Sequence, residues 1–210
     1  MRDLIVSYVR TFEGAEHEEF YKIWEAICLR DNIPLHIFDN GERMLHYPTA
    51  LNEVYVTLQS EAKHILLVDH DFVPNPTVDW TGRSLIEDKA AVACMYKHYL
   101  TEFPEMAGSW FTLLDTEKVP ELDARWWAWT PLPRWSLPAE DTMNWLPAQY
   151  DTVLLPSKGV GLGVEYATGR HLHFSRYLTY PPHRRKHIPR DVNPNAVARE
   201  MIDEFWSRFE

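Results

Sequence analysis

Short apolar runs alternate with helical periodicities along the first sixty residues of the chain. Residues 4–9 and 33–38 are rich in β-branched and aromatic side chains, which predicts two strands. Apolar residues between these runs recur at helical spacing and predict a helix over roughly residues 15–30. The second run ends at Asp39-Asn40-Gly41, a strong turn signal. The pattern is that of a strand–helix–strand unit.

The same alternation continues to residue 95. Pro48 is well placed to open a second helix. The buried face of that helix would carry Leu51, Val54, Tyr55 and Leu58. Residues 65–68 form an apolar run bounded by turn signals, typical of a buried strand. A polar stretch over 81–89 predicts a helix, and residues 90–95 predict a fourth strand. This order predicts an α/β fold with a mostly parallel, Rossmann-like sheet flanked by helices.

The pattern changes after about residue 103. Prolines and six of the nine tryptophans fall between residues 104 and 147, which predicts an irregular, aromatic and proline-rich lobe. Its rings would form a small separate core or a stacking wall for a sugar or a base. The chain closes with a helix that has Asn193 as its N-cap and Pro194 at its first position.

Composition and charge narrow the class of protein. The 210 residues are 45% hydrophobic and 25% charged, which suits one globular domain over residues 1–210. No apolar segment is long enough to span a bilayer, and the first residues enter a strand rather than a secretory signal. Two cysteines make neither a disulfide framework nor a zinc cluster. We therefore expect a cytoplasmic protein without membrane contact.

The net charge of −10 argues against broad, non-specific attraction to nucleic acid. The distribution is uneven, because residues 183–190 contain a basic cluster. The cluster consists of His183, Arg184, Arg185, Lys186, His187 and Arg190. It fits either a solvated loop or a contact with phosphate groups.

The strongest chemical signal is Asp69-His70-Asp71, which directly follows the apolar run 65–68 and precedes Pro74 and Pro76. In open α/β sheets, ligands gather at the carboxyl ends of the strands. Two carboxylates at such an end can hold a divalent cation, which in turn can hold a diphosphate. A structural role, as two acids that cap the end of a strand, is the alternative.

Four segments together resemble a nucleotide-sugar-dependent glycosyltransferase of the GT-A fold, nearest to family 2. They are residues 5–11, similar to the opening strand and first nucleotide-binding loop; residues 37–41, similar to the second strand with its D-N-G end; Asp69-His70-Asp71, which matches the D-x-D motif; and Glu140-Asp141, similar to the later acidic pair. The resemblance covers roughly the first two-thirds of the chain. It implies a nucleotide-sugar-binding half over residues 1–103, an acceptor-side lobe over 104–192 and a C-terminal helix over 193–210.

The resemblance also implies site residues. Asp71, assisted by Asp69, would bind Mn²⁺ or Mg²⁺. A late histidine serves as a further ligand in many GT-A enzymes, and the family pattern favours His173 over His171 of the His-x-His pair. The same pair also suits a partly exposed polar face of a strand.

The donor and acceptor sites follow from the same resemblance. Asp39 would meet the base of a nucleoside diphosphate sugar, with UDP favoured, and Tyr8 or Thr11 would line the nucleoside pocket. Asp141, or less favourably Glu140, would act as general base toward an acceptor hydroxyl, as in an inverting enzyme. The late histidine is closer to retaining family 8 enzymes, which leaves inversion or retention open. Residues 159–163 are glycine-rich, but they lie too late for a phosphate loop and suit a turn or a close-packed strand.

Three other functions fit parts of the pattern. A haloacid-dehalogenase-type phosphatase also carries D-x-D after an apolar strand, but on its first strand. A non-catalytic module could use the aromatic lobe and the basic cluster to hold nucleic acid or another polymer. Small phage glycosyltransferases modify hydroxymethylated bases in DNA, so DNA is a candidate acceptor and the host cytoplasm a candidate location.

Overall fold

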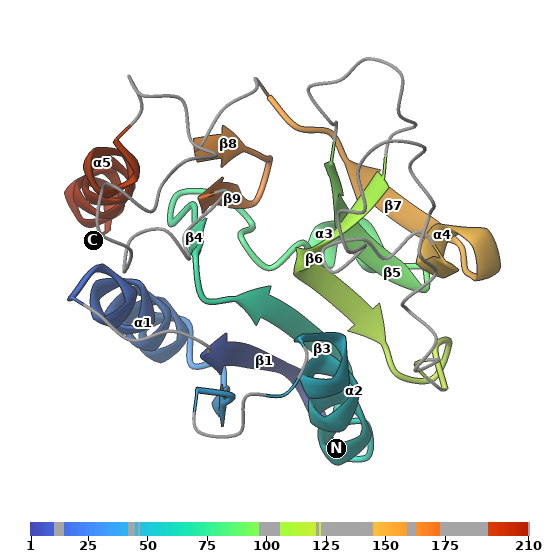
Figure 1. Cartoon of the computed structure of the whole chain (residues 1–210). Helices are drawn as coiled ribbons and strands as arrows, with labels where there is room; N and C mark the ends of the chain where they lie inside the picture. The colour runs from blue at the N-terminus through green and yellow to red at the C-terminus, as the bar shows by residue number, and fades with distance from the viewer. Residues whose placement is uncertain are drawn as a thin grey trace.

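The structure is a computed structural model, drawn in Figure 1. It describes residues 1–10, 15–41, 45, 47–96, 106–120, 122, 145–158, 163–172 and 193–209. Predictions that concern other residues lie outside this part of the chain.

A six-stranded sheet forms the centre of the described fold. Its strands follow the spatial order β2–β1–β3–β6–β5–β7. Their bounds are Leu35–Asp39 (β2), Arg2–Arg10 (β1), Ala62–Asp69 (β3), Met106–Asp115 (β6), Ala91–Tyr96 (β5) and Thr152–Leu155 (β7). Strand β1 is parallel to β2 and β3, and β5 is parallel to β7, whereas β6 is antiparallel to both of its neighbours. The predicted α/β fold with a mostly parallel sheet is confirmed.

Strand β6 corrects the expectation of an irregular lobe from residue 104. Its ten residues lie between β3 and β5 in the middle of the sheet. Both of its faces are covered, with Phe111 and Leu113 in one core and Leu114 in the other. A strand buried on both sides lacks the polar alternation that reveals a half-exposed strand. The many tryptophans between residues 104 and 147 also favoured the interpretation as an irregular lobe over a strand.

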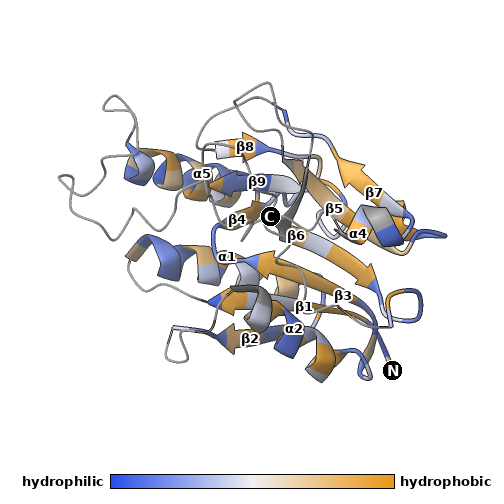
Figure 2. Ribbon diagram, turned by 45° about the vertical axis from the view of Figure 1, so that its right-hand side comes forward, coloured by the Kyte–Doolittle hydropathy of each residue, from blue (hydrophilic) through white to orange (hydrophobic). Residues whose placement is uncertain are grey.

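Helices cover both faces of the sheet because alternate residues of each strand point to opposite sides. Leu4, Val6 and Tyr8 of β1 pack in the core that contains helices α1 (Ala15–Arg30) and α5 (Pro194–Arg208). Ile5 and Val9 pack in the other core, with helix α2 (Tyr47–Leu58). In Figure 2, long stretches of the central strands are orange, the colour of apolar residues. Two short helices, α3 (Arg83–Ile86) and α4 (Trp145–Gln149), complete the set described.

The end of α1 shows how local sequence sets the connection into β2. Asn32 adopts a left-handed backbone with φ of 52°. The N–H of Ile33 donates to the carbonyl of Cys28 at 2.8 Å, and the N–H of Asn32 donates to that of Leu29 at 3.2 Å. This is a Schellman motif, with asparagine in the place that glycine most often takes. Ile33 packs against the core, so the chain leaves the helix aimed at the sheet.

A second, three-stranded sheet lies between the central sheet and α5. Its order is β4 (Phe72–Pro74), β9 (Gly169–Leu172) and β8 (Gly163–Glu165), with antiparallel pairing throughout. Residues 72–74 thus continue as a strand, although the two prolines Pro74 and Pro76 would be expected to stop regular structure after Asp71. Gly163 opens β8, and residues 159–162 lie outside the described part. Because β4 follows β3 after a turn of two residues, the second sheet starts beside the carboxyl end of β3.

The C-terminal helix forms as its sequence predicts. The side chain of Asn193 accepts a hydrogen bond from the N–H of Asn195, and Pro194 occupies the start of the helix. Ala198, Met201, Ile202 and Phe205 form its buried face. Among the described helices, none is both long enough and apolar enough to cross a bilayer.

Candidate metal centre

The carboxyl end of β3 places Asp69 and Asp71 at one edge of the central sheet. Asp69 is the last residue of β3 and pairs with Val9 of β1. One strand further along, Asp39 ends β2 and pairs with Arg10. Parallel strands bring their carboxyl ends to the same edge, so Asp39 and Asp69 share that edge although thirty residues separate them in sequence.

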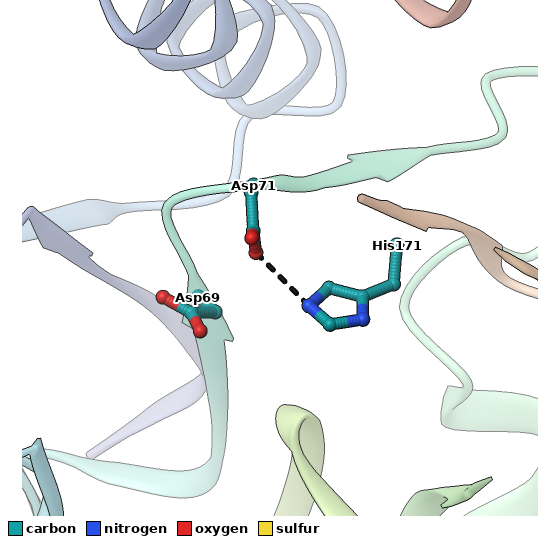
Figure 3. Close-up of side chains that lie close together, drawn as sticks. All are labelled: Asp69, Asp71 and His171. Atoms are coloured by element: carbon teal, nitrogen blue, oxygen red, sulfur yellow. Dashed lines mark ion pairs between the residues drawn. The ribbon is translucent and has the colours of Figure 1, made fainter. Parts of the chain in front are cut away.

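Strand β9 brings a histidine to these acids. His171 pairs with Phe72 of β4, the residue that follows Asp71. The N–H of Leu172 donates to the carbonyl of Asp71 at 3.1 Å, which fixes β9 against the turn. As Figure 3 shows, the imidazole of His171 points at the carboxylate of Asp71. Residues 100 positions apart in sequence therefore meet through strand pairing.

Asp69, Asp71 and His171 form a compact cluster of three candidate ligands. Nε2 of His171 lies 3.1 Å from Oδ1 of Asp71, and one ligand atom from each residue lies within 4.8 Å of the others. The side chain of Asp69 is 15% exposed, whereas those of Asp71 and His171 are 5% and 7% exposed. The cluster is thus largely buried and reaches solvent mainly beside Asp69.

The donor set fits a divalent cation. Protein ligands to such ions lie about 2.1 Å from the metal, so neighbouring ligands of an octahedron lie about 3 Å apart. The distance between Asp71 and His171 matches that spacing. Two carboxylates and one imidazole suit Mn²⁺ or Mg²⁺ with further positions for other oxygen ligands, although imidazole favours the transition metal.

A second layer of contacts holds the turn between β3 and β4. Oδ1 of Asp69 accepts hydrogen bonds from the backbone N–H of His70 at 2.7 Å and from its ring Nδ1 at 2.5 Å. The hydroxyl of Tyr8 donates to the carbonyl of His70 at 3.1 Å. Nε1 of Trp24 donates to the carbonyl of Phe72 at 2.9 Å. These bonds fix the backbone from which both acids project.

The ring of His171 is held by a tryptophan. Trp110 of β6 stacks on it with ring centroids 4.5 Å apart and an interplanar angle of 3°. Trp110 is itself only 2% exposed and bends over Gly108, where a Cβ would lie 2.3 Å from the indole ring. Strand β6, which the sequence pattern does not reveal, therefore supplies the surface that orients the candidate metal ligand.

A buried histidine of α1 lies beneath the turn. The ring centroids of His17 and His70 are 5.1 Å apart, and His17 is 4% exposed. Burial, and next the neighbouring His70, lower the pKa of His17 to about 4, although Asp71 acts in the opposite direction. His17 is therefore neutral near pH 7.

Electrostatics also mark Tyr8 as part of this environment. Burial, and then the charges of Asp69 and Asp71, raise its pKa well above the ordinary value of 10. With 1% exposure and its hydroxyl bonded to the His70 carbonyl, Tyr8 supports the turn from within the core. The contact with a nucleoside that the sequence suggests for Tyr8 remains a prediction.

Asp39 lies open at the same edge of the sheet. Its Oδ1 accepts a hydrogen bond from the N–H of Gly41 at 3.0 Å. The next residue, Asn40, is buried and exchanges two hydrogen bonds with the backbone of Leu45, donating at 2.9 Å and accepting at 3.0 Å. The D-N-G turn thus has a fixed side chain, Asn40, and an exposed one, Asp39.

Several predicted site residues lie outside the described part of the chain. These are Thr11, Glu140, Asp141, His173 and the basic cluster of residues 183–190. Among the described residues, His171 lies beside the two acids, and the role of His173 stays a prediction. Sequence reasoning did not single out His17 or Trp110. His17 precedes Phe20 and Trp24 at helical spacing, and this pattern alone could have indicated that His17 lies on the buried face of the helix.

Comparison with known proteins gives little beyond this geometry. No protein-family model and no curated protein matches the chain. Among solved structures, the chain is similar to a glycosyltransferase involved in the glycosylation of the major capsid of PBCV-1. The TM-score is 0.40 and the sequence identity 9%, over 55% of this chain and 62% of that chain. The match thus spans less than two thirds of that neighbour, and a likeness at this TM-score does not by itself establish a function.

Proposed function

We propose that this protein is a metal-dependent glycosyltransferase that moves a sugar from a nucleoside diphosphate sugar to a hydroxyl acceptor. The observation that supports this most is the meeting of Asp69, Asp71 and His171 at the carboxyl end of a central strand. Ligands of open α/β sheets bind at that edge. Mixed oxygen and nitrogen donors in a partly buried setting suit a cation that binds phosphate oxygens.

Asp69, Asp71 and His171 would each contribute to binding the cation that holds the nucleoside diphosphate sugar. Asp71 and His171, at 3.1 Å from each other, would bind the cation from two neighbouring positions. Asp69, at the more exposed side, would bind it directly or through a water ligand. A Mn²⁺ or Mg²⁺ ion held there would neutralise the negative charge that develops on the diphosphate as the glycosidic bond breaks.

Asp39 would recognise the nucleoside. It is exposed at the sheet edge that also carries Asp69, and the Asn40 bonds hold its backbone. Its carboxylate would accept hydrogen bonds from the N–H of a base or from ribose hydroxyls. We favour uracil as the base, and Thr11 as a further residue of this pocket.

The acceptor side rests on residues beyond the described part of the chain. Asp141, or less favourably Glu140, would remove the proton from the acceptor hydroxyl as general base, in an inverting reaction. His173 would add a ligand to the cation. The basic cluster of residues 183–190 would suit a phosphate-bearing acceptor such as DNA with hydroxymethylated bases.

Thermal unfolding with defined ligands tests the proposal. Ligand binding to the folded state raises the melting temperature. We expect UDP with Mn²⁺ to raise it more than the two separate shifts combined, and expect slow release of UDP from UDP-glucose. Asp71→Asn should lose both effects. The matched control Asp88→Asn changes an exposed aspartate and should keep both.

Different outcomes identify the other candidate functions. Failure of UDP, GDP and dTDP to give any metal-dependent shift would contradict the proposal. Release of phosphate from p-nitrophenyl phosphate, lost in Asp69→Asn, would indicate a phosphatase instead. Salt-sensitive binding of DNA with no nucleotide effect would indicate a binding module.

A further inference from the structure

The residue between the two acids is buried, although it lies in a turn. His70 is 5% exposed, and together with Asp71 it forms the turn between β3 and β4. Connecting segments usually lie at the surface and expose their polar side chains to water. A polar ring that is buried in such a place needs a hydrogen-bond partner within the protein.

That partner is Asp69, the residue directly before His70. Nδ1 of the His70 ring donates to Oδ1 of Asp69 at 2.5 Å, and the backbone N–H of His70 donates to the same oxygen at 2.7 Å. An ionised carboxylate only accepts hydrogen bonds, so Nδ1 must carry the hydrogen. One residue thus supplies both hydrogen bonds that Asp69 receives from the described part of the chain.

These two bonds determine which oxygen of Asp69 remains for a cation. Each carboxylate oxygen has about two lone-pair sites. Oδ1 already accepts two hydrogen bonds, whereas Oδ2 accepts none from the described residues. A cation held by Asp69, Asp71 and His171 would therefore bind Oδ2 of Asp69. Two bonds to one oxygen also restrain the rotation of the carboxylate.

Neighbouring side chains hold the His70 ring in this position. The ring of His17, from α1, lies with its centroid 5.1 Å from that of His70. The hydroxyl of Tyr8 donates to the carbonyl of His70 at 3.1 Å and so fixes its backbone. A buried ring among packed neighbours stays close to one rotamer. The donor that restrains Asp69 is therefore itself fixed.

We propose that His70 is a positioning residue for the metal centre, whose Nδ1–H group holds Oδ1 of Asp69 so that Oδ2 binds the cation. A ligand that is already oriented loses less rotational freedom when the cation binds, so the affinity is higher. The inference rests on the proposed function, because Asp69 needs to be positioned only where a cation binds.

Two substitutions of His70 separate the hydrogen-bond donor from the ring. His70→Phe keeps a packed ring but removes the donor, and His70→Leu replaces it if the phenylalanine variant does not fold. His70→Asn loses the ring, but its amide nitrogen is as many bonds from Cα as Nδ1 of histidine and can donate to Asp69. We expect His70→Phe to weaken Mn²⁺ binding about 10- to 100-fold, the range typical of residues that orient metal ligands, and His70→Asn to retain most of the affinity.

Electron paramagnetic resonance of free Mn²⁺ measures these affinities, on variants that circular dichroism shows to be folded. His64, at the other end of β3, supplies the matched control. It is 7% exposed, and its Nδ1 donates to the carbonyl of Asp3 at 3.1 Å. His64→Phe also removes a buried donor from this part of the fold, but should leave Mn²⁺ affinity unchanged. Equal weakening by His64→Phe and His70→Phe would trace the loss to general destabilisation and overturn the proposal.

A double-mutant cycle shows whether His70 acts through Asp69. Asp69→Ala removes the ligand that His70 would position, so adding His70→Phe to Asp69→Ala should cause little further loss of Mn²⁺ affinity. Independent effects would instead add in full. Full additivity overturns the proposal, as does equal loss of affinity in His70→Phe and His70→Asn.

Failure of the proposed function gives a different result. A natural protein that binds no Mn²⁺ contradicts the metal centre itself, and the role of His70 with it. A natural protein that binds Mn²⁺ and then UDP, but keeps its Mn²⁺ affinity in His70→Phe, contradicts only the role of His70.

Discussion

The two ends of strand β3 each combine aspartate with histidine, yet the surroundings of these residues differ. At the amino end, His64 lies 3.8 Å from Asp115 and 3.8 Å from Asp3. At the carboxyl end, His171 lies 3.1 Å from Asp71, with Asp69 alongside. The two clusters contain the same residue types at opposite ends of one strand. Any difference in their ability to bind a metal must therefore come from the surrounding residues.

At the amino end, backbone N–H groups donate hydrogen bonds to the carboxylate of Asp115. Oδ1 of Asp115 accepts hydrogen bonds from the N–H groups of Glu117 and Lys118, and the ammonium of Lys118 lies 3.6 Å from Oδ2. This is a turn cap with its own cation. At the carboxyl end, both hydrogen bonds of Asp69 with described residues fall on Oδ1 and come from His70, and Oδ2 accepts none from the described part of the chain. Asp115 thus has hydrogen-bond donors and a cation within its own turn. Asp69, Asp71 and His171 instead come from two strands and place their ligand atoms within 4.8 Å of one another.

The largest expected effect separates the two ends by metal binding. Asp71→Ala should abolish the rise in melting temperature that Mn²⁺ alone produces, since it removes a central ligand. Asp115→Ala should destabilise the fold by about 1–3 kcal/mol, because it removes the two hydrogen bonds that cap the turn, but should keep the Mn²⁺ effect. Differential scanning calorimetry with and without MnCl₂ measures both. Equal loss of the Mn²⁺ effect in both variants would remove the distinction between the ends.

The next effect concerns acid stability. The folded state lowers the pKa of His17 from 6.5 to about 4, so the unfolded chain binds the proton more readily. Stability contributed by neutral His17 is present above pH 6.5 and is lost as the pH falls toward 4, by about 3 kcal/mol. His17→Phe should flatten this part of the pH profile measured by urea unfolding.

His64 supplies the matched test at the other end of the strand. Burial lowers its pKa too, although the hydrogen bond that Nδ1 of His64 donates to the Asp3 carbonyl and the charges of Asp115 and Asp3 act in the opposite direction. His64→Phe should therefore flatten the profile less than His17→Phe. A larger effect of His64→Phe would show that the burial of His17 is not the source of the acid sensitivity.

A smaller effect is expected from the tryptophan that stacks on His171. Trp110→Leu removes the flat surface and should weaken Mn²⁺ binding about tenfold, the range typical of residues that orient metal ligands. Trp110→Phe keeps a ring and should restore most of the affinity. Both variants create space in the core, so isothermal titration is done where each is fully folded. If the two variants lose affinity equally, stacking is not what orients His171.

The smallest effect is expected from Tyr8. Tyr8→Phe removes one hydrogen bond to the His70 carbonyl and should cost about 0.5–1.5 kcal/mol of unfolding free energy. Tyr55→Phe is the matched control, because its buried hydroxyl bonds the carbonyl of Val119 in the other core. Both should lose similar stability, but only Tyr8→Phe should also shift the Mn²⁺ affinity. A shift in both would place the effect in general stability.

Local patterns were enough to predict the first three strands and the two helices between them. The run 65–68 also placed Asp69 and Asp71 at the carboxyl end of a central strand, where the structure has them. Strand β6 escaped prediction because it is buried on both faces and therefore lacks polar alternation. Periodicity reports how a segment is exposed, not which strand it will join.

The late histidines show the same limit. Residues 171 and 173 of an extended strand would share one face, so alternation alone does not separate them as candidate ligands. The register of β4 with β9 pairs His171 with Phe72 and thereby places it beside Asp71. Register depends on contacts between segments about 100 residues apart, and no short motif encodes it.

Crystals grown with MnCl₂ and UDP would reveal the bound ion through the anomalous scattering of manganese. We expect an anomalous peak within bonding distance of Asp71 and His171, with diphosphate oxygens completing the coordination. A peak beside Asp115 and His64, or a diphosphate bound away from the end of β3, would contradict it.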